Sequence, residues 1–325
     1  DEIRRKIALF TNVEIDGVIE ARDVETIYEV PLSLKKQRLD DVIAERLGLD
    51  LPQPDMTSWT AMVNRVKHPS AGTAKIAVVG KYTDHIDSYK SIQESLIHGG
   101  IANDVKADIH WLSSEVFDNG EGVEKLKEYD GLLIPGGFGP RGVEGMLETI
   151  RWARENQMPF FGICLGLQCA VIEFARNVCG LEGSHSSEFA EASPDPVICL
   201  LDSQLQVTTM GGTMRLGAYP CALGEGTKAR EIYGVDEISE RHRHRFEVNN
   251  EYRDLLTDNG MTISGTSPDG GLVEMIELTE HPWFVAGQFH PELKSRPTRP
   301  HPLFASFVGA AAAYARNQPA KPAAE

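Results

Sequence analysis

The stretch that decides the fold is Pro159-Phe160-Phe161-Gly162-Ile163-Cys164-Leu165-Gly166-Leu167-Gln168. Its apolar first half predicts a buried strand over Pro159–Ile163, and the residues that follow predict a helix over Leu165–Val178. Between the two, Cys164 has one glycine two residues before it and another two residues after it. A nucleophilic residue on a sharp turn between a strand and a helix is typical of a nucleophile elbow.

The flanking glycines have a steric purpose, because residues without Cβ atoms relieve crowding at a strained turn and let the sulfur project. Cys164 also begins the predicted helix, and a helix N-terminus favours the thiolate over the thiol. A free cysteine is more often a buried structural residue. That interpretation suits the other cysteines, Cys169, Cys179, Cys199 and Cys221. For Cys164 the glycines and the strand–helix setting favour a catalytic nucleophile.

Outward from this turn, apolar strands alternate with helices from Lys75 onward. Strands are predicted at Ile76–Gly80, Ile109–Leu112, Gly131–Pro135 and Phe284–Phe289, and helices at Tyr89–His98, Gly145–Asn156 and Leu303–Tyr314. This alternation predicts an α/β fold, a mostly parallel sheet with helices on both faces. Functional loops of such sheets gather at the carboxyl ends of the strands. Strand patterns at Leu205–Thr209 and Leu272–Leu278 predict extra antiparallel strands.

The N-terminal part of the chain differs in character. Residues 1–50 contain a short strand pattern at Ile7–Phe10 and a helical pattern at Leu39–Leu47, and we interpret them as the end of a larger domain. Residues 51–73, with several prolines and a helical patch at Trp59–Val66, are predicted to be a linker. The α/β domain is predicted over 74–317 and a disordered tail over 318–325. Because the chain begins with Asp1, we expect a fragment.

Composition excludes several classes of protein. The 325 residues include 32 Lys and Arg against 48 Asp and Glu, a formal net charge of −16. Such a chain is a poor candidate for binding nucleic acid or an anionic membrane surface, since both need clustered basic residues. The five cysteines fit neither a disulfide framework nor a zinc knuckle, and no bilayer-spanning apolar run or signal peptide is recognised. A cytoplasmic location is therefore expected.

A thiolate nucleophile needs a histidine that carries protons. His290 ends an apolar strand, and Glu292 lies two residues later, so both side chains can point to one side of an extended segment. The carboxylate would then fix the tautomer of the imidazole and stabilise the imidazolium. Alternative bases are His242 and His244, in a charged run expected to face solvent, and His185, expected in a surface loop.

Acyl transfer also needs donors for the developing oxyanion. Gly136-Gly137-Phe138-Gly139 follows a predicted strand and offers approachable backbone amides. The amide of Leu165, directly after the nucleophile, is the natural second donor.

Together these residues resemble the class I glutamine amidotransferase family, whose domain is flavodoxin-like. The matching motifs are Pro135–Gly139, Gly162–Gln168 and Gln288–Glu292. Further stretches resemble the CTP synthase family, namely Val79–Tyr82, Ser184–Phe189, Gly211–Gly217 and Arg241–Asn249. The resemblance covers nearly the whole chain.

The resemblance implies a role for each site residue. Cys164 would attack the side-chain amide of L-glutamine, His290 would shuttle the proton, Glu292 would orient it, and a γ-glutamyl thioester and ammonia would form. Glutamine would be bound by Gly137, Leu165, Gly166, Leu167, Gln168, Glu188 and Arg245. Charge agrees with this, since Glu188 suits the ammonium of an amino acid and Arg245 its carboxylate. The glycine-containing segment Gly211–Gly217 would close the pocket.

The same resemblance implies nucleotide partners. Lys6 would meet the phosphates of UTP or CTP, and Arg22, Asp23 and Val24 would lie beside the base of ATP. No metal or cofactor is expected for glutamine hydrolysis, whereas the full-length enzyme, a homotetramer, would use ATP and Mg²⁺ and be activated by GTP. The sequence contains no G-x-x-x-x-G-K-[ST] loop. This chain is therefore expected to hydrolyse glutamine without making CTP.

Three other interpretations stay open from the sequence. The first is the amidotransferase half of an enzyme with another acceptor, and Gly211–Gly217 and Arg241–Asn249 argue against it. The second is a γ-glutamyl hydrolase, against which Glu188 and Arg245 favour free glutamine. The third is a non-catalytic regulatory module, and the intact set of Cys164, His290 and Glu292 argues against that.

Overall fold

The computed structural model describes residues 2–200 and 214–318, which form two compact units, 1–70 and 71–325. The predicted strand at Leu205–Thr209, most of the tail and the first part of the segment Gly211–Gly217 lie outside the described residues. Within the described parts of the chain, no helix combines the length and the apolar character that crossing a membrane requires.

The second unit is built on a nine-stranded sheet in the order β2-β1-β3-β4-β12-β11-β10-β7-β8. The first five strands in this order run parallel to one another: β2 (Lys106–Ser113), β1 (Thr73–Gly80), β3 (Gly131–Ile134), β4 (Phe160–Ile163) and β12 (Phe284–Gly287). The other four continue the sheet in antiparallel pairs: β11 (Val273–Leu278), β10 (Met261–Thr266), β7 (Arg215–Leu223) and β8 (Glu237–His244). The predicted parallel sheet and its antiparallel additions are both confirmed.

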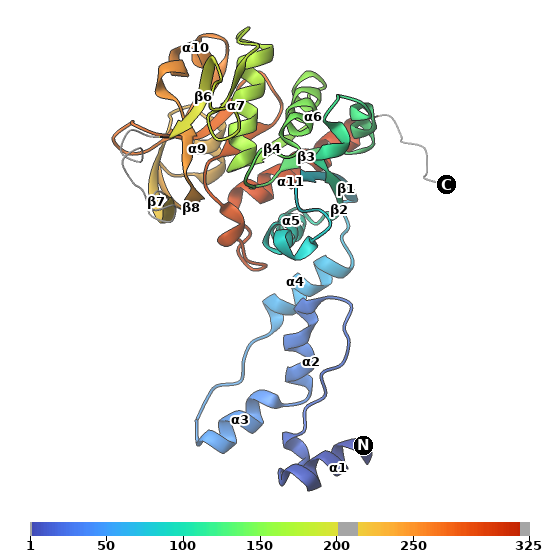
Figure 1. The fold of residues 1–325 in the computed structure, drawn as a ribbon. Helices are drawn as coiled ribbons and strands as arrows, with labels where there is room; N and C mark the ends of the chain where they lie inside the picture. The colour runs from blue at the N-terminus through green and yellow to red at the C-terminus, as the bar shows by residue number, and fades with distance from the viewer. Residues whose placement is uncertain (1, 201–213, 319–325) are drawn as a thin grey trace. The chain divides into compact units, whose positions relative to one another are not determined.

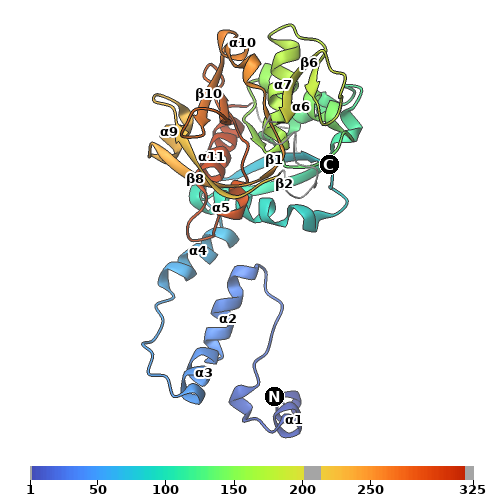
Figure 2. The same ribbon diagram turned by 60° about the vertical axis from the view of Figure 1, so that its left-hand side comes forward.

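Helices cover both faces of the parallel part (Figures 1 and 2). One face packs against α6 (Val143–Glu155) and α7 (Leu165–Asn177), and the other against α5 (Lys90–Asn103) and α11 (Pro302–Asn317). The strands alternate accordingly, since Leu132 and Ile134 of β3 join the first core cluster and Leu133 joins the second. The α/β expectation is therefore correct in its layers as well as in its elements.

Smaller elements complete this unit. They are the second sheet, β5 (Ser184–Ser186), β6 (Asp195–Leu200) and β9 (Phe246–Val248), and the short helices α9 (Lys228–Tyr233) and α10 (Arg253–Asp258). The second sheet lies beside α7, because Val197 and Ile198 of β6 pack in the same core cluster as that helix. It thus brings β9, and the residues just before it, close to the end of β4.

The described residues of the first unit form four α-helices: α1 (Glu2–Thr11), α2 (Val30–Lys36), α3 (Leu39–Leu47) and α4 (Thr57–Lys67). The predicted strand at Ile7–Phe10 is wrong, because these residues belong to α1. A run of four apolar residues does not distinguish a strand from part of a helix. The helix predicted at Leu39–Leu47 is confirmed. Within the predicted linker, α4 belongs to the first unit and has Met62 and Val63 buried, and Trp59 Nε1 donates to the carbonyl of Tyr28.

Candidate active site

Cys164 occupies the turn between β4 and α7 in a strained backbone conformation, with φ 54° and ψ −100°. The neighbouring glycines are sterically required. A Cβ atom on Gly162 would lie 2.8 Å from the Cβ of Ala286, and one on Gly166 would overlap the carbonyl oxygen of Ile134. The turn can therefore form only because these two positions lack side chains.

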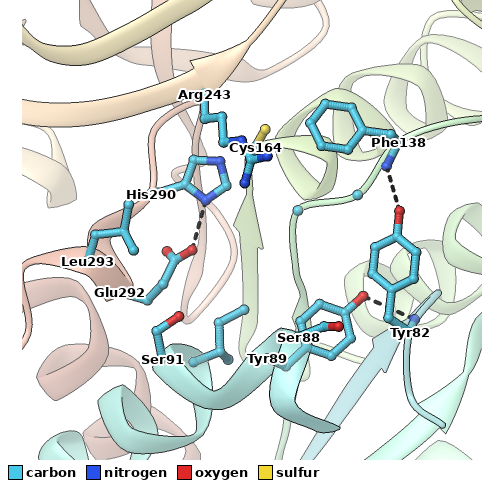
Figure 3. Close-up of a pocket in the computed structure, with 13 residues that line it drawn as sticks. Tyr82, Ser88, Tyr89, Ser91, Phe138, Cys164, Arg243, His290, Glu292 and Leu293 are labelled. Carbon is cyan, nitrogen blue, oxygen red and sulfur yellow. Dashed lines mark hydrogen bonds and ion pairs between the residues drawn. The ribbon is translucent and has the colours of Figure 1, made fainter. Parts of the chain in front are cut away.

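His290 and Glu292 reach the same place from the end of β12. The Nδ1 atom of His290 lies 2.7 Å from Oε1 of Glu292, and the amide of His290 donates to the carbonyl of Arg241 at 2.7 Å. Gly136, after β3, lies against both catalytic candidates, because a Cβ atom there would be 2.9 Å from Cε1 of His290 and 3.6 Å from Cβ of Cys164. Three strand ends thus bring these groups together (Figure 3).

The electrostatics of the site favour a protonated His290. Burial alone lowers the pKa of its imidazole, but the nearby sulfur of Cys164 and the carboxylate of Glu292 outweigh burial and raise that pKa to about 11. Nδ1 of His290 is held by Glu292. The ring is therefore oriented by one nitrogen, and its other nitrogen remains available for proton transfer.

The sequence-based expectation for the other histidines is wrong. His242 and His244 are buried, because β8 alternates and points its arginines outward and its histidines inward. Burial lowers the pKa of His242 to about 2 and that of His244 to about 3, so both rings are neutral. They bond to each other, Nδ1 to Nε2, at 2.8 Å. His185 lies half-buried in strand β5, beside Glu144, and not in a surface loop.

Behind His242 and His244 lies a buried ionic cluster that sequence reasoning did not predict. Arg215 contacts Glu247 at 3.1 Å and Glu274 at 2.7 Å, and both carboxylates are fully buried. Burial raises the pKa of Glu274, and it raises the pKa of Glu247 to about 8. The positive charge of Arg215 lowers both pKa values but does not outweigh burial. One guanidinium faces two carboxylates, so a proton is retained on Glu247 at neutral pH.

This retained proton makes stability depend on pH. The pKa of Glu247 rises from 4.5 when unfolded to about 8 when folded, so the folded state binds more protons between these values. Stability from this group is therefore lost as pH rises through that window, at a rate of at most about 1.4 kcal/mol per pH unit. We expect melting temperature to fall more between pH 6 and pH 8 in the parent protein than in Glu247→Gln. Glu251→Gln, at an exposed position, is the control; equal falls in parent and Glu247→Gln would refute the assignment.

A second cavity beside Cys164 gathers the residues predicted to bind glutamine. Gly137, Gln168, Glu188 and Arg245 all line it, together with Cys164. Oε1 of Glu188 accepts from the amide of Gly139 at 3.1 Å, and Gln168 is held by the carbonyl of Phe246 at 3.0 Å. An acidic and a basic side chain therefore face the same small space next to the sulfur.

Other predicted residues take different positions. Leu165, Gly166 and Leu167 are buried in the first turn of α7, and the side chain of Leu167 packs in the core. Leu165 is the first residue of α7, where helix amides have no acceptor within the helix. Of the predicted closing segment, Met214 lines the second cavity and Arg215 begins β7, whereas residues 211–213 lie outside the described residues.

The larger cavity, of about 420 Å³, extends from Cys164 to residues that sequence reasoning did not assign. Tyr82, Tyr89, Arg243 and Leu293 are among them (Figure 3). The stretch Val79–Tyr82 was the available signal for Tyr82, since Tyr82 comes just after a predicted strand, at the functional edge of the sheet. In the described residues, no group of three or more His, Cys, Asp or Glu side chains is arranged to hold a metal ion.

The predicted nucleotide-binding residues belong to the first unit. Lys6 is exposed on α1 and pairs with Glu2 at 3.3 Å. Arg22 is exposed and pairs with Glu20, Asp23 is exposed, and Val24 is half-buried. Their nucleotide contacts stay a prediction.

Comparisons with known proteins give matches over most of the chain. Residues 84–310 match the family model for glutamine amidotransferase class-I, and residues 1–49 match that for the CTP synthase N-terminus. The chain is 55% identical to a CTP synthase of Clostridium perfringens and 56% identical to one of Carboxydothermus hydrogenoformans, over 96% and 95% of this chain. It spans 58% of the length of each of these relatives.

A solved structure of the Trypanosoma brucei CTPS glutaminase domain with bound acivicin is also similar. The identity is 38% and the TM-score 0.70, over 74% of this chain and 94% of that one.

Proposed function

The chain belongs to the CTP synthase family, and from this membership we propose that residues 74–317 hydrolyse L-glutamine to glutamate and ammonia through Cys164, His290 and Glu292. The observation that carries the proposal is the joint placement of two sets of groups around one sulfur. Cys164 lines one cavity with His290, which Glu292 holds, and it lines a second cavity with the oppositely charged residues Glu188 and Arg245.

The geometry supports a specific course of reaction. Arg245 binds the α-carboxylate of glutamine and Glu188 its ammonium, which directs the side-chain amide to Cys164. The thiolate attacks the amide carbon, and the amides of Gly137 and Leu165 stabilise the oxyanion. His290 gives its proton to the leaving nitrogen, so that ammonia departs and a γ-glutamyl thioester remains.

The second half of the reaction uses the same groups in reverse. Neutral His290 takes a proton from water, which attacks the thioester carbonyl, and glutamate leaves as the thiolate re-forms. Glu292 stabilises the imidazolium in both halves through its 2.7 Å contact with Nδ1.

We also propose that the ammonia serves the conversion of UTP to CTP in the full-length protein, a homotetramer that uses ATP and Mg²⁺ and responds to GTP. This rests on family membership and on the match of residues 1–49 to the family's N-terminus. Within the described residues there is no carboxylate cluster suited to Mg²⁺.

Covalent labelling tests the proposal. The glutamine mimic 6-diazo-5-oxonorleucine should alkylate Cys164, because the thiolate displaces dinitrogen from its protonated diazo carbon and forms a thioether. Peptide mass spectrometry should place the mass of the reagent less dinitrogen on Cys164, and excess glutamine should slow the labelling. Labelling of other cysteines at an equal rate, or protection by a γ-glutamyl peptide but not by glutamine, would contradict it.

A further inference from the structure

Lys81 is a buried cation for which the proposed chemistry has no use. It follows β1 and is only 5% exposed. Its Nζ donates to the carbonyl oxygen of Gly139 and lies 5.4 Å from the centre of the Phe189 ring. Its aliphatic stem passes beneath Gly137, since a Cβ atom on that glycine would be 3.3 Å from Cδ of Lys81. Burying an ammonium is costly unless its partners compensate, so these contacts require an explanation.

Several bonds join the loop after β1 to the loop after β3. The guanidinium of Arg141 donates to the carbonyl of Lys81 at 2.8 Å. In this bond the loop after β3 supplies the donor, whereas in the bond from Lys81 to Gly139 it supplies the acceptor. The amide of Phe138 donates to the Tyr82 hydroxyl at 3.4 Å (Figure 3). The Tyr89 hydroxyl accepts from the amide of Lys81 at 3.1 Å. The loop that carries Gly137 is thus held, through Phe138, Gly139 and Arg141, to the two residues that follow β1.

Gly139 also connects Lys81 to the substrate-facing carboxylate. Its carbonyl accepts from Lys81, and its amide donates to Glu188 at 3.1 Å. Burial raises the pKa of Glu188, whereas the Gly139 amide and the charges of Lys81 and Arg245 lower it. Lys81 is therefore one of the few groups that oppose protonation of this half-buried carboxylate.

We propose that Lys81 is a positioning residue that fixes the oxyanion loop Gly136–Gly139 through the Gly139 carbonyl and supplies the positive charge that Glu188 needs in order to bind the ammonium of the substrate. The inference rests on the proposed glutaminase function. Lys81 would act in two ways. By placing Gly137 it would affect kcat, and by keeping Glu188 charged it would affect KM.

The two effects respond differently to substitution. Lys81→Met keeps the stem and removes both donor and charge, so we expect kcat to fall about 10²-fold, as for misplaced catalytic groups, and KM to rise. The rise in KM should be larger at pH 6 than at pH 8.5, because without Lys81 Glu188 is more easily protonated. Lys81→Gln restores a neutral donor, and it should recover part of kcat while leaving the pH-dependent defect in KM.

The readout is initial-rate ammonia release against glutamine concentration, from pH 6 to pH 8.5, with melting temperatures as the check on folding. Lys106→Met, at an exposed position on edge strand β2, is the matched control and should equal the parent. Parental kcat and KM in folded Lys81→Met, or a KM defect independent of pH, would overturn the inference. Cys164→Ala with parental activity would instead overturn the glutaminase function itself, so the two failures are distinguishable.

Discussion

Replacing Cys164 with alanine is expected to lower the rate of ammonia release from glutamine by at least about 10³-fold. The variant lacks the sulfur that would form the proposed thioester, and His290 has no thiol beside it with which to exchange a proton. The alanine Cβ occupies the position of the cysteine Cβ at the same φ of 54°. The melting temperature should therefore stay near that of the parent, so that lost activity reports lost chemistry.

The matched control is Cys179→Ala, which removes a half-buried thiol that does not line either cavity beside Cys164. Its rate should equal that of the parent. If Cys164→Ala and the parent release ammonia at the same rate, Cys164 does not take part in glutamine hydrolysis. The interpretation of the chain as a non-catalytic module would then be favoured.

The elements around Cys164 could be predicted because each leaves a strong local signal. Phe160–Ile163 is a continuous apolar run before a glycine-flanked cysteine, which is typical of a buried parallel strand and its turn. The position of His290 followed from the same logic, since it comes shortly after another apolar strand, β12 (Phe284–Gly287). That the two residues meet depends on β12 pairing with β4, a parallel pairing between segments far apart in the sequence. The sequence indicated the strand ends, and the sheet order brings them together.

The predictions for His242 and His244 were wrong because these residues lie in a polar stretch of sequence but are buried in the folded protein. His242 and His244 alternate with arginines, so the run is highly charged in sequence, but alternation along β8 separates the two kinds of side chain onto opposite faces. Their burial depends on the cluster of Arg215, Glu247 and Glu274, which comes from three different strands. Lys81 was recognised only as part of a family stretch, because its partner Gly139 lies on another loop.

Arg245 is expected to determine which end groups the substrate must carry. In the proposed complex its guanidinium pairs with the α-carboxylate of glutamine inside a small cavity that Glu188 also lines. Removing one partner of a desolvated charge pair costs about 2–5 kcal/mol. Arg245→Met should therefore lower kcat/KM for glutamine about 10²- to 10³-fold. The loss should appear mainly in KM, because the α-carboxylate takes no part in bond breaking.

Comparing glutamine with an analogue that lacks the α-carboxylate distinguishes the loss of the Arg245–carboxylate contact from a general distortion of the pocket. Glutaminamide, in which the α-carboxylate is replaced by an amide, cannot form the ion pair, so the parent should already use it poorly and Arg245→Met should use it about equally well. Arg151→Met serves as the control, since Arg151 is exposed on α6 and pairs with Glu155. Ammonia-release kinetics on both substrates measure the coupling between Arg245 and the carboxylate. An equal fold-loss on glutamine and glutaminamide would mean that Arg245 shapes the pocket without binding the carboxylate, and the orientation of glutamine between Arg245 and Glu188 would have to be abandoned.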